Sequence, residues 1–325
     1  MSGIIVTPQI VRRIEDNLRY ILVSAWARRE SNLWWRRVTK TRSSSTKREL
    51  LQWMLETAQI RSMGNGGRYT YDDLVEIFWE IVNEDFGAAL NLTADEISDG
   101  EALDRAGKWA RHIGNSGAYW PQGQIANLLK NGKTLLCYDG QPFFSKTHPV
   151  NPYIGAASGV FPNLFTGVKF SPDNLALVYA EVEKIVAPDG IPRHLQPKLV
   201  AAGPDLRYPV TQALGADVYA DPLNNQGAPA TNIIKTHYGF VEPIIAPELN
   251  EPGVWYLFCE LVEDDELGAL IYQERSPYGL NSYAPMNDVQ LGQMDAFEWQ
   301  LKGRNAASYG HPFLCFRMEP QGQFP

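Results

Sequence analysis

The longest helical pattern in the chain lies between Glu101 and Asn131. Its apolar residues recur at intervals of three and four, at Leu103, Ala106, Ala110, Ile113, Ile125, Leu128 and Leu129. About 30 residues of uninterrupted helix would extend roughly 45 Å. Four residues that weaken helices fall inside the pattern: Gly114, Gly117, Pro121 and Gly123. We therefore expect one long helix that breaks or kinks between residues 114 and 123 and ends at Gly132.

The rest of the chain alternates helices with short strands. Helical spacing predicts helices at 6–27 and 172–186 and a helical turn at 206–214. Apolar or alternating runs predict strands at 199–203, 241–245, 254–262 and 268–273, and a last strand with Phe313, Cys315 and Arg317. Residues 71–85 are ambiguous between helix and strand, and 220–230 reads as an exposed loop. This order predicts an α+β fold.

Charge is unevenly distributed along the 325 residues. The net charge is −8, but residues 1–70 contain thirteen Lys or Arg and five Asp or Glu, so this segment carries +8 and the remainder −16. An acidic whole argues against a surface that binds nucleic acid or anionic membrane everywhere. A basic leading segment has two readings: an arm that binds nucleic acid, or an arm that docks on the acidic body of a neighbouring copy.

Motifs for metal or cofactor binding are weak. The five histidines, at 112, 148, 194, 237 and 311, form no HxH or HExxH motif. The glycine-rich run at 63–68 lacks the Lys-Ser/Thr of a phosphate loop, and the acidic run at 263–266 is more typical of a solvated loop than of a cation site. The sequence therefore indicates neither a metal nor another cofactor.

Three cysteines, at 137, 259 and 315, form no CxxC pair, and their odd number with long gaps indicates reduced thiols without structural disulfides. No signal peptide or membrane-spanning run is evident in the sequence. We therefore expect a soluble intracellular product with no membrane partner.

The stretch LLCYDGQPFFSKTHPV, residues 135–150, brings together Cys137, Asp139, Ser145 and His148. A cysteine hydrolase using Cys137 and His148 would need a base within hydrogen-bond reach and an oxyanion hole, and this spacing guarantees neither. Asp139-Gly140 is a hairpin signal, and alternation from Leu135 to Tyr138 makes Cys137 a small buried residue. We therefore favour a turn over an active site and expect no enzyme.

The same stretch carries a family resemblance. Residues 123–150, GQIANLLKNGKTLLCYDGQPFFSKTHPV, resemble the signature region of the Mu-like phage major head subunit (T protein) family. Further similarities lie at Ile5–Pro8 (IVTP), at 195–217 (LQPKLVAAGPDL to LGAD), at 255–258 (WYLF) and at 271–275 (IYQER). The resemblance covers most of residues 1–318 and is weakest at 28–85, where the loop layout departs from the family pattern.

This resemblance implies the Hong Kong 97 type of tailed-phage capsid fold. By that likeness, residues 1–34 are an N-terminal arm, 35–85 an extended loop that reaches a neighbour, 86–134 with 250–325 a peripheral domain, and 135–249 an axial domain. The helix at 101–131 is the candidate for the long spine helix of the peripheral domain. The CYDGQ block is then the place where the chain leaves the spine.

The implied function is that of a major capsid protein, which self-assembles into hexamers and pentamers of an icosahedral phage head. Partners would be further copies of the chain, scaffold and portal proteins, and double-stranded DNA that is enclosed without sequence-specific binding. The virion would be its location, after assembly in the bacterial host cytoplasm. The alternatives are a basic-arm nucleic-acid-binding protein and, less favoured, the cysteine hydrolase.

Contacts between subunits are expected from the basic, tryptophan-rich segment, because Trp and Arg dominate interface energies. The candidate contact residues are Trp34, Trp35, Arg36, Arg37, Lys40, Arg42, Lys47, Arg48 and Trp53. The alternatives for this basic run are a solvated loop and a DNA contact. We expect it to meet the acidic surface of a neighbouring subunit rather than packaged DNA.

Overall fold

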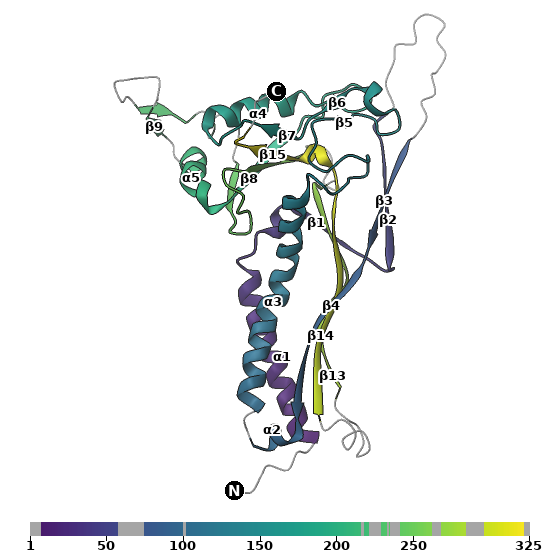
Figure 1. Ribbon diagram of the computed structural model, residues 1–325, viewed down its shortest axis with the longest axis vertical. Coiled ribbons are helices and arrows are strands. Elements are labelled where there is room, and N and C mark those ends of the chain that lie inside the picture. Colours follow the sequence, from purple (N-terminus) through teal and green to yellow (C-terminus); the bar gives the residue numbers. More distant parts are fainter. Residues whose placement is uncertain are drawn as a thin grey trace, which may run out of the picture.

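The computed structural model is elongated and describes residues 8–57, 75–99, 102–215, 218–220, 229–232, 234, 241–261, 268–283 and 296–321 (Figure 1). Two long helices and a four-stranded sheet form its lower half, and a five-stranded sheet with shorter helices forms its upper half. The glycine-rich run at 63–68, the acidic run at 263–266, His237 and most of the 220–230 loop lie outside the described residues. None of the helices in the described ranges combines the length and hydropathy needed to span a membrane.

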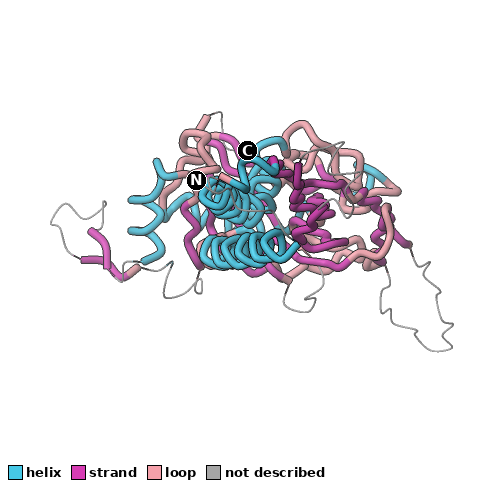
Figure 2. The backbone as a smooth tube through the Cα atoms, turned by 90° about the horizontal axis from the view of Figure 1, so that it is seen from below, coloured by secondary structure: helices cyan, strands magenta, loops and turns pink. Residues whose placement is uncertain are grey.

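Helix α3 (Ala102–Asn131) is continuous, so the predicted break between 114 and 123 is wrong. It lies parallel to α1 (Pro8–Glu30), which confirms the helix predicted at 6–27. The two helices run side by side next to the strands (Figure 2). The glycines serve this contact: a Cβ on Gly114 would lie 2.7 Å from the Leu22 carbonyl oxygen, and one on Gly117 would lie 2.5 Å from the Trp26 ring. They are close-approach positions rather than helix ends.

Helix α1 is amphipathic and docks inside its own subunit. The residues that it buries follow helical spacing: Val11, Ile14, Leu18, Leu22 and Ala25. The first four belong to a core that includes Ala106 and Ala110 of α3 and Trp299 of the sheet. Residues 8–30, which were expected in an arm directed at a neighbour, therefore lie along α3 of the same chain.

The lower sheet has the order β1-β13-β14-β4. Its strands are β1 (Thr39–Ser43), β13 (Leu270–Tyr283), β14 (Ala296–Tyr309) and β4 (Glu84–Thr93). β1 is parallel to β13, and the other pairs are antiparallel. Leu90, Leu92 and Leu301 point from one face into the core under α1 and α3. The short helix α2 (Ala94–Ser98) follows β4 behind a capping box of Thr93 and Glu96.

The upper sheet has the order β11-β8-β12-β15-β7. Its strands are β11 (Glu242–Ile245), β8 (Gln196–Ala202), β12 (Trp255–Glu260), β15 (Cys315–Glu319) and β7 (Leu164–Thr166), and the helices of this half are α4 (Pro172–Glu183) and α5 (Arg207–Gly215). Strands β12 and β15 come from the range expected in a peripheral domain, yet they pair with strands of the expected axial range. One sheet therefore joins the two ranges.

The end of α3 is tied to both sheets. A helix leaves its last carbonyl groups without helical partners. The Leu128 carbonyl accepts a hydrogen bond from Tyr309 Oη of β14 at 2.7 Å. The Leu129 carbonyl accepts from Tyr256 Oη of β12 and from Arg317 Nη1 of β15, each at 3.4 Å. Three strands of two sheets thus meet at one helix terminus.

Strands β2 (Arg48–Met54) and β3 (Glu76–Val82) form a separate antiparallel ribbon, which settles residues 76–82 of the ambiguous segment as a strand. Its inner side chains Leu51 and Ile81 lie against Ile271 and Ala306 of the lower sheet. The remaining short elements are η1 (Trp35–Arg37), β5 (His148–Pro149), η2 (Gly155–Ser158), β6 (Val160–Phe161), η3 (Pro204–Leu206), β9 (Val218–Ala220), β10 (Pro229–Thr231) and η4 (Pro312–Leu314).

The glycines of α3 give a matched test of the helix contact. Gly114→Ala should lower the free energy of unfolding by about 1–3 kcal/mol, because the added Cβ must displace α1 backbone. Gly123→Ala should raise it by about 0.5–1 kcal/mol, because its nearest neighbour is a Tyr119 ring atom at 3.7 Å and alanine favours the helix. Urea unfolding of both variants measures the difference. Equal stability of the two would contradict the close approach of α1.

Candidate functional site

The outer face of the β2–β3 ribbon exposes large apolar side chains. Burial alternates along both strands, and the register pairs Gln52 with Phe78 and Leu50 with Glu80. The exposed fractions of Leu50, Met54, Phe78 and Val82 are 60%, 58%, 48% and 39%. Because all four lie on one face of two paired strands, they form a continuous surface, which we call the outer ribbon face. Sequence reasoning missed it, although Leu50-Leu51 in a strand already places one leucine on each side.

Two of the predicted contact residues are buried inside the subunit. Trp34 and Trp35 are 7% and 2% exposed. The Trp35 ring lies 4.7 Å from the Tyr272 ring, centroid to centroid, and the Arg36 guanidinium lies 4.5 Å from the centroid of the Trp35 ring. Both tryptophans are therefore core residues, and only a rearrangement of the subunit would bring them to a neighbour.

Trp34 belongs to a polar network that joins α3 to the upper half. Its backbone N–H donates to Gln122 Oε1 at 2.9 Å, and its Nε1 donates to Glu248 Oε2 at 3.3 Å. Glu248 Oε1 also accepts from Tyr119 Oη and Gln122 Nε2, each at 2.8 Å. Partial burial disfavours the Glu248 carboxylate, but a backbone hydrogen bond at Glu248 and the side-chain hydrogen bonds from Gln122, Tyr119 and Trp34 outweigh it and lower the pKa of Glu248. A cavity of about 340 Å³ lies beside Glu248 and Tyr119.

Several basic contact candidates already have partners in their own chain. Arg36 pairs with Glu30 at 2.6 Å, Arg37 pairs with Glu242, and Arg48 pairs with Glu80 at 3.0 Å. The side chains of these pairs are largely exposed, so each pair contributes little to stability. Arg36, Arg37, Arg42, Lys47 and Arg48 are exposed, and Lys40 is half-buried. The basic candidates thus lie at the surface, unlike the tryptophans.

Hydrogen bonds hold the turn between β1 and β2 in place. Glu49 Oε1 accepts from the backbone N–H groups of Ser45 and Thr46 and from the Ser44 hydroxyl, at 2.8–2.9 Å. The hydrogen bonds from Thr46, Ser44 and Ser45 lower the pKa of Glu49 to about 2. Asn83 Nδ2 donates to Ser44 Oγ, which ties this turn to the junction of β3 and β4.

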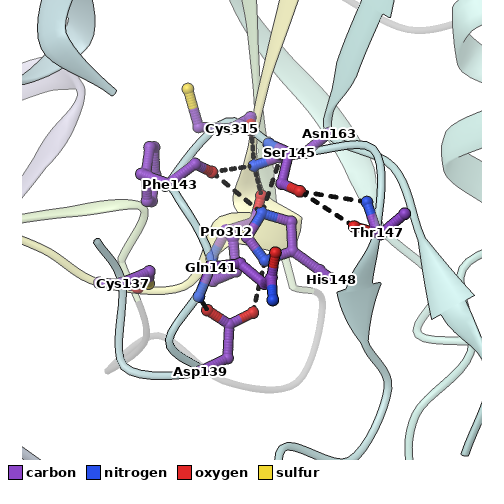
Figure 3. A network of polar contacts seen from close by, with 11 residues as sticks. Cys137, Asp139, Gln141, Phe143, Ser145, Thr147, His148, Asn163, Pro312 and Cys315 are labelled. Carbon is purple, nitrogen blue, oxygen red and sulfur yellow. Dashed lines mark hydrogen bonds and ion pairs between the residues drawn. The ribbon is translucent and has the colours of Figure 1, made fainter. Parts of the chain in front are cut away.

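The CYDGQ block forms a turn with a buried polar network at its centre (Figure 3). Gly140 has a φ of 76°, and a single bridge between Leu136 and Pro142 replaces the expected paired strand. His148 is fully buried, and its Nδ1 lies 2.5 Å from Asp139 Oδ2. The loop is therefore closed by a contact between its own side chains.

Asn163 fixes the orientation of this network. Its Nδ2 donates to the carbonyls of Phe143, Pro312 and Cys315, so its Oδ1 must accept. That oxygen accepts from the Ser145 N–H at 2.8 Å and from His148 Nε2 at 3.1 Å. Nε2 therefore donates to this oxygen, and Nδ1 faces the Asp139 carboxyl group. Asn163 escaped sequence reasoning because nothing in its local sequence marks it.

The geometry does not assemble the cysteine and histidine of a hydrolase. Both ring nitrogens of His148 are occupied by Asp139, Asn163 and the Phe143 carbonyl. The Cys137 thiol lies 3.5 Å from the Gly310 carbonyl oxygen, and burial raises its pKa well above the ordinary value. Cys137, Cys259 and Cys315 are all free and buried. Within the described part of the chain, no group of three or more His, Cys, Asp or Glu side chains could hold a metal ion.

Trp53, the remaining contact candidate, lies next to the last residue of β2. Its ring centroid is 4.8 Å from that of His311 and 5.0 Å from that of Tyr138. Burial, with Arg193 and Arg42 nearby, lowers the pKa of His311 to about 3. This histidine is therefore neutral in the folded protein at neutral pH.

Comparison with known protein families gives one family match. Residues 14–169 match the model described as the Mu-like prophage major head subunit gpT. The chain is also similar to the major capsid protein of Escherichia phage Mu, with 30% identity over 164 residues, which are 49% of this chain and 51% of that protein. The match therefore spans about half the length of this curated relative.

Solved structures with a similar fold include phage capsids. The chain is similar to the procapsid of bacteriophage JBD30, with a TM-score of 0.51 and 18% identity, over 98% of this chain and 77% of that one. It is similar to the mature capsid of bacteriophage PhiM1 (TM-score 0.53, 11% identity, 90% and 88% covered). It is also similar to the capsid of cyanophage P-SCSP1u (TM-score 0.54, 11% identity, 87% of each chain). The fold is that of Hong Kong 97-type capsid proteins, as the sequence resemblance implied.

The network in Figure 3 predicts a large effect of Asn163→Leu. The substitution leaves the Ser145 N–H and three carbonyls without a side-chain partner, so the free energy of unfolding should fall by about 3–5 kcal/mol. Asn17→Leu, at an exposed position of α1, should change it by less than about 0.5 kcal/mol. Urea unfolding measures both. A loss below about 1 kcal/mol for Asn163→Leu would mean that water replaces the amide.

The low pKa of His311 predicts acid sensitivity. The unfolded chain binds this proton near pH 6.5 and the folded protein only near pH 3. The contribution to stability is therefore complete above pH 6.5 and falls between pH 6.5 and 3, by about 1.4 kcal/mol per pH unit at most. Unfolding at pH 7, 6, 5 and 4 should show a shallower decline for His311→Phe than for the parent. Parallel declines would show that His311 does not titrate as its burial requires.

Proposed function

We propose that this chain, whose residues 14–169 match the model of the Mu-like prophage major head subunit, is the major capsid protein of a tailed bacteriophage. Copies of the chain would assemble into hexamers and pentamers and form the icosahedral shell around the genome. The observation that carries the proposal is the family match, and the capsid-like fold over most of the chain supports it. The proposed role is structural and not enzymatic.

Self-association is supported by the surface of the subunit. The outer ribbon face exposes four large apolar side chains that the subunit itself leaves uncovered. A shell protein gains from such a surface, because many modest contacts add up in a closed lattice. The +8 charge of residues 1–70 against −16 elsewhere adds complementary potentials between copies. We infer that the β2–β3 ribbon contacts a neighbouring subunit.

The domain assignment that we propose keeps the expected residue ranges with two changes. We propose that residues 35–85 act as the extended loop and 135–249 as the core of the axial domain. The peripheral domain would comprise 86–134 with β13 and β14, whereas β12 and β15 would belong to the axial domain because of their pairing. Within residues 1–34, α1 would act as part of the peripheral domain, because it packs on α3.

The basic surface residues are proposed to contact an acidic surface of the neighbouring subunit rather than DNA. They are Arg36, Arg37, Lys40, Arg42, Lys47, Arg48, without the buried Trp34 and Trp35. The partners proposed for the assembled protein are its own copies, scaffold and portal proteins, and double-stranded DNA enclosed without sequence-specific contacts. Its proposed location is the virion, after assembly in the bacterial host cytoplasm.

Particle formation tests the proposal directly. The expressed chain, alone and together with the scaffold protein of its phage, should sediment as large closed particles that are visible by negative-stain microscopy. A chain that remains monomeric under both conditions and binds DNA in a salt-dependent manner would instead support the nucleic-acid-binding alternative.

Charges on the outer ribbon face should block this assembly. Leu50→Asp with Phe78→Asp should reduce particle yield by about tenfold or more, because buried unpaired carboxylates disfavour the contact between subunits. Thermal unfolding of the unassembled subunit should change little, because both positions are exposed. Leu50→Met with Phe78→Leu keeps the apolar area and should assemble normally. Normal yield from the Asp variant would remove the outer ribbon face from the interface.

A further inference from the structure

The β2–β3 ribbon is a single layer of two strands. We ask which contacts fix its angle to the rest of the subunit, which we call the body. Its two strands hydrogen-bond with each other and with no other strand in the described residues. Its inner face meets the lower sheet through Leu51 and Ile81. A two-stranded ribbon is marginally stable by itself. Contacts between its side chains and the rest of the subunit must therefore hold it in place.

An aromatic contact holds the end of β2. Trp53 meets Tyr138 and His311 edge to face, at interplanar angles of 79° and 75°. His311 is 4% exposed. Edge-to-face pairs contribute roughly 0.5–1.5 kcal/mol each beyond the apolar area that they bury, and they constrain the orientation of the ring. Trp53 thus connects β2 to the CYDGQ turn and to the segment before β15.

A cation holds Glu56, which follows the end of β2 at Met54. Arg193 Nη1 lies 2.7 Å from Glu56 Oε2, and the Arg193 side chain is only 7% exposed. The Arg193 guanidinium lies 4.0 Å from the centroid of the Phe313 ring. One side chain therefore joins the ribbon to η4 of the body by a salt bridge and a cation–π contact.

Strand β3 is held at the same level. Tyr153 Oη donates to the Glu76 carbonyl at 2.5 Å, and Glu76 is the register partner of Met54. A cavity of about 860 Å³ opens beside Glu56 and Arg193. The direction of the ribbon at this level therefore depends on a few specific contacts.

We infer that Trp53 and Arg193 are positioning residues, which hold the ribbon at one angle to its own subunit and thereby present the outer ribbon face to a neighbour in a fixed direction. This inference rests on the proposed function for its consequence in assembly, but the angle itself is a property of the single subunit. Trp53 acts within its chain, through Tyr138 and His311, rather than as a contact between subunits.

Distances between two spin labels on the unassembled subunit test the inference. Gln52→Cys on the ribbon and Leu177→Cys on α4 provide two exposed sites, and the three native cysteines are buried. The parent should give one narrow distance distribution. Trp53→Leu and Arg193→Gln should each shift it or make it about twice as broad, because the ribbon loses a contact at its base. Thermal unfolding in each background reports whether the body remains folded.

Two matched variants separate positioning from general destabilisation. Trp53→Phe keeps an edge-to-face ring and should restore the narrow distribution, and Phe78→Ala on the outer ribbon face should leave it unchanged. Unchanged distributions for both Trp53→Leu and Arg193→Gln would overturn the inference, even if those variants assemble poorly. A broadened distribution in a variant that still forms normal particles would sustain the positioning role and count against the ribbon contact in the proposed function.

Discussion

The two halves of this subunit are connected by hydrogen bonds to the last carbonyl groups of one helix. Helix α3 ends between the sheets, and its Leu128 and Leu129 carbonyls would be costly to bury without partners. Tyr309 from the lower sheet and Tyr256 and Arg317 from the upper sheet supply the donors. The positive charge of Arg317 also suits the negative end of the helix dipole. Arg317 in turn pairs with Glu251 and Glu319, so the connection extends into the upper half.

The sequence predicted many of the individual helices and strands, but it did not predict which of them pack or pair with one another. Apolar periodicity identified α1, α3 and α4, because burial of one face imposes that period locally. It also located β8, β11, β12, β15 and the first part of β13, but it missed β1, β7 and β14. The predicted break in α3 failed because Gly114 and Gly117 are needed for contact with α1, which residue spacing within one helix does not reveal. The placement of β12 beside β8 and of β15 beside β12 depends on pairing between strands more than 50 residues apart. The family resemblance reached the fold, which local patterns alone left at α+β.

The candidate contact residues show the same limit. Tryptophan is enriched both in cores and in interfaces, so composition could not separate Trp34 and Trp35, which are buried, from the exposed basic residues beside them. The outer ribbon face becomes recognisable only when β2 and β3 are paired in register. Likewise, Asn163 matters because of carbonyl groups that come from residues 143, 312 and 315. Such sites are defined by the fold and not by any short motif.

The order of strands in the upper sheet has a consequence for synthesis of the chain on the ribosome. Strand β15 lies between β12 and β7, and β7 has no other neighbour in that sheet. Strand β7, residues 164–166, therefore cannot pair within this sheet before β15, residues 315–319, has been synthesised. Contacts of such sequence separation form late and slowly. A nascent chain therefore cannot complete the upper sheet until residues 315–319 have left the ribosome.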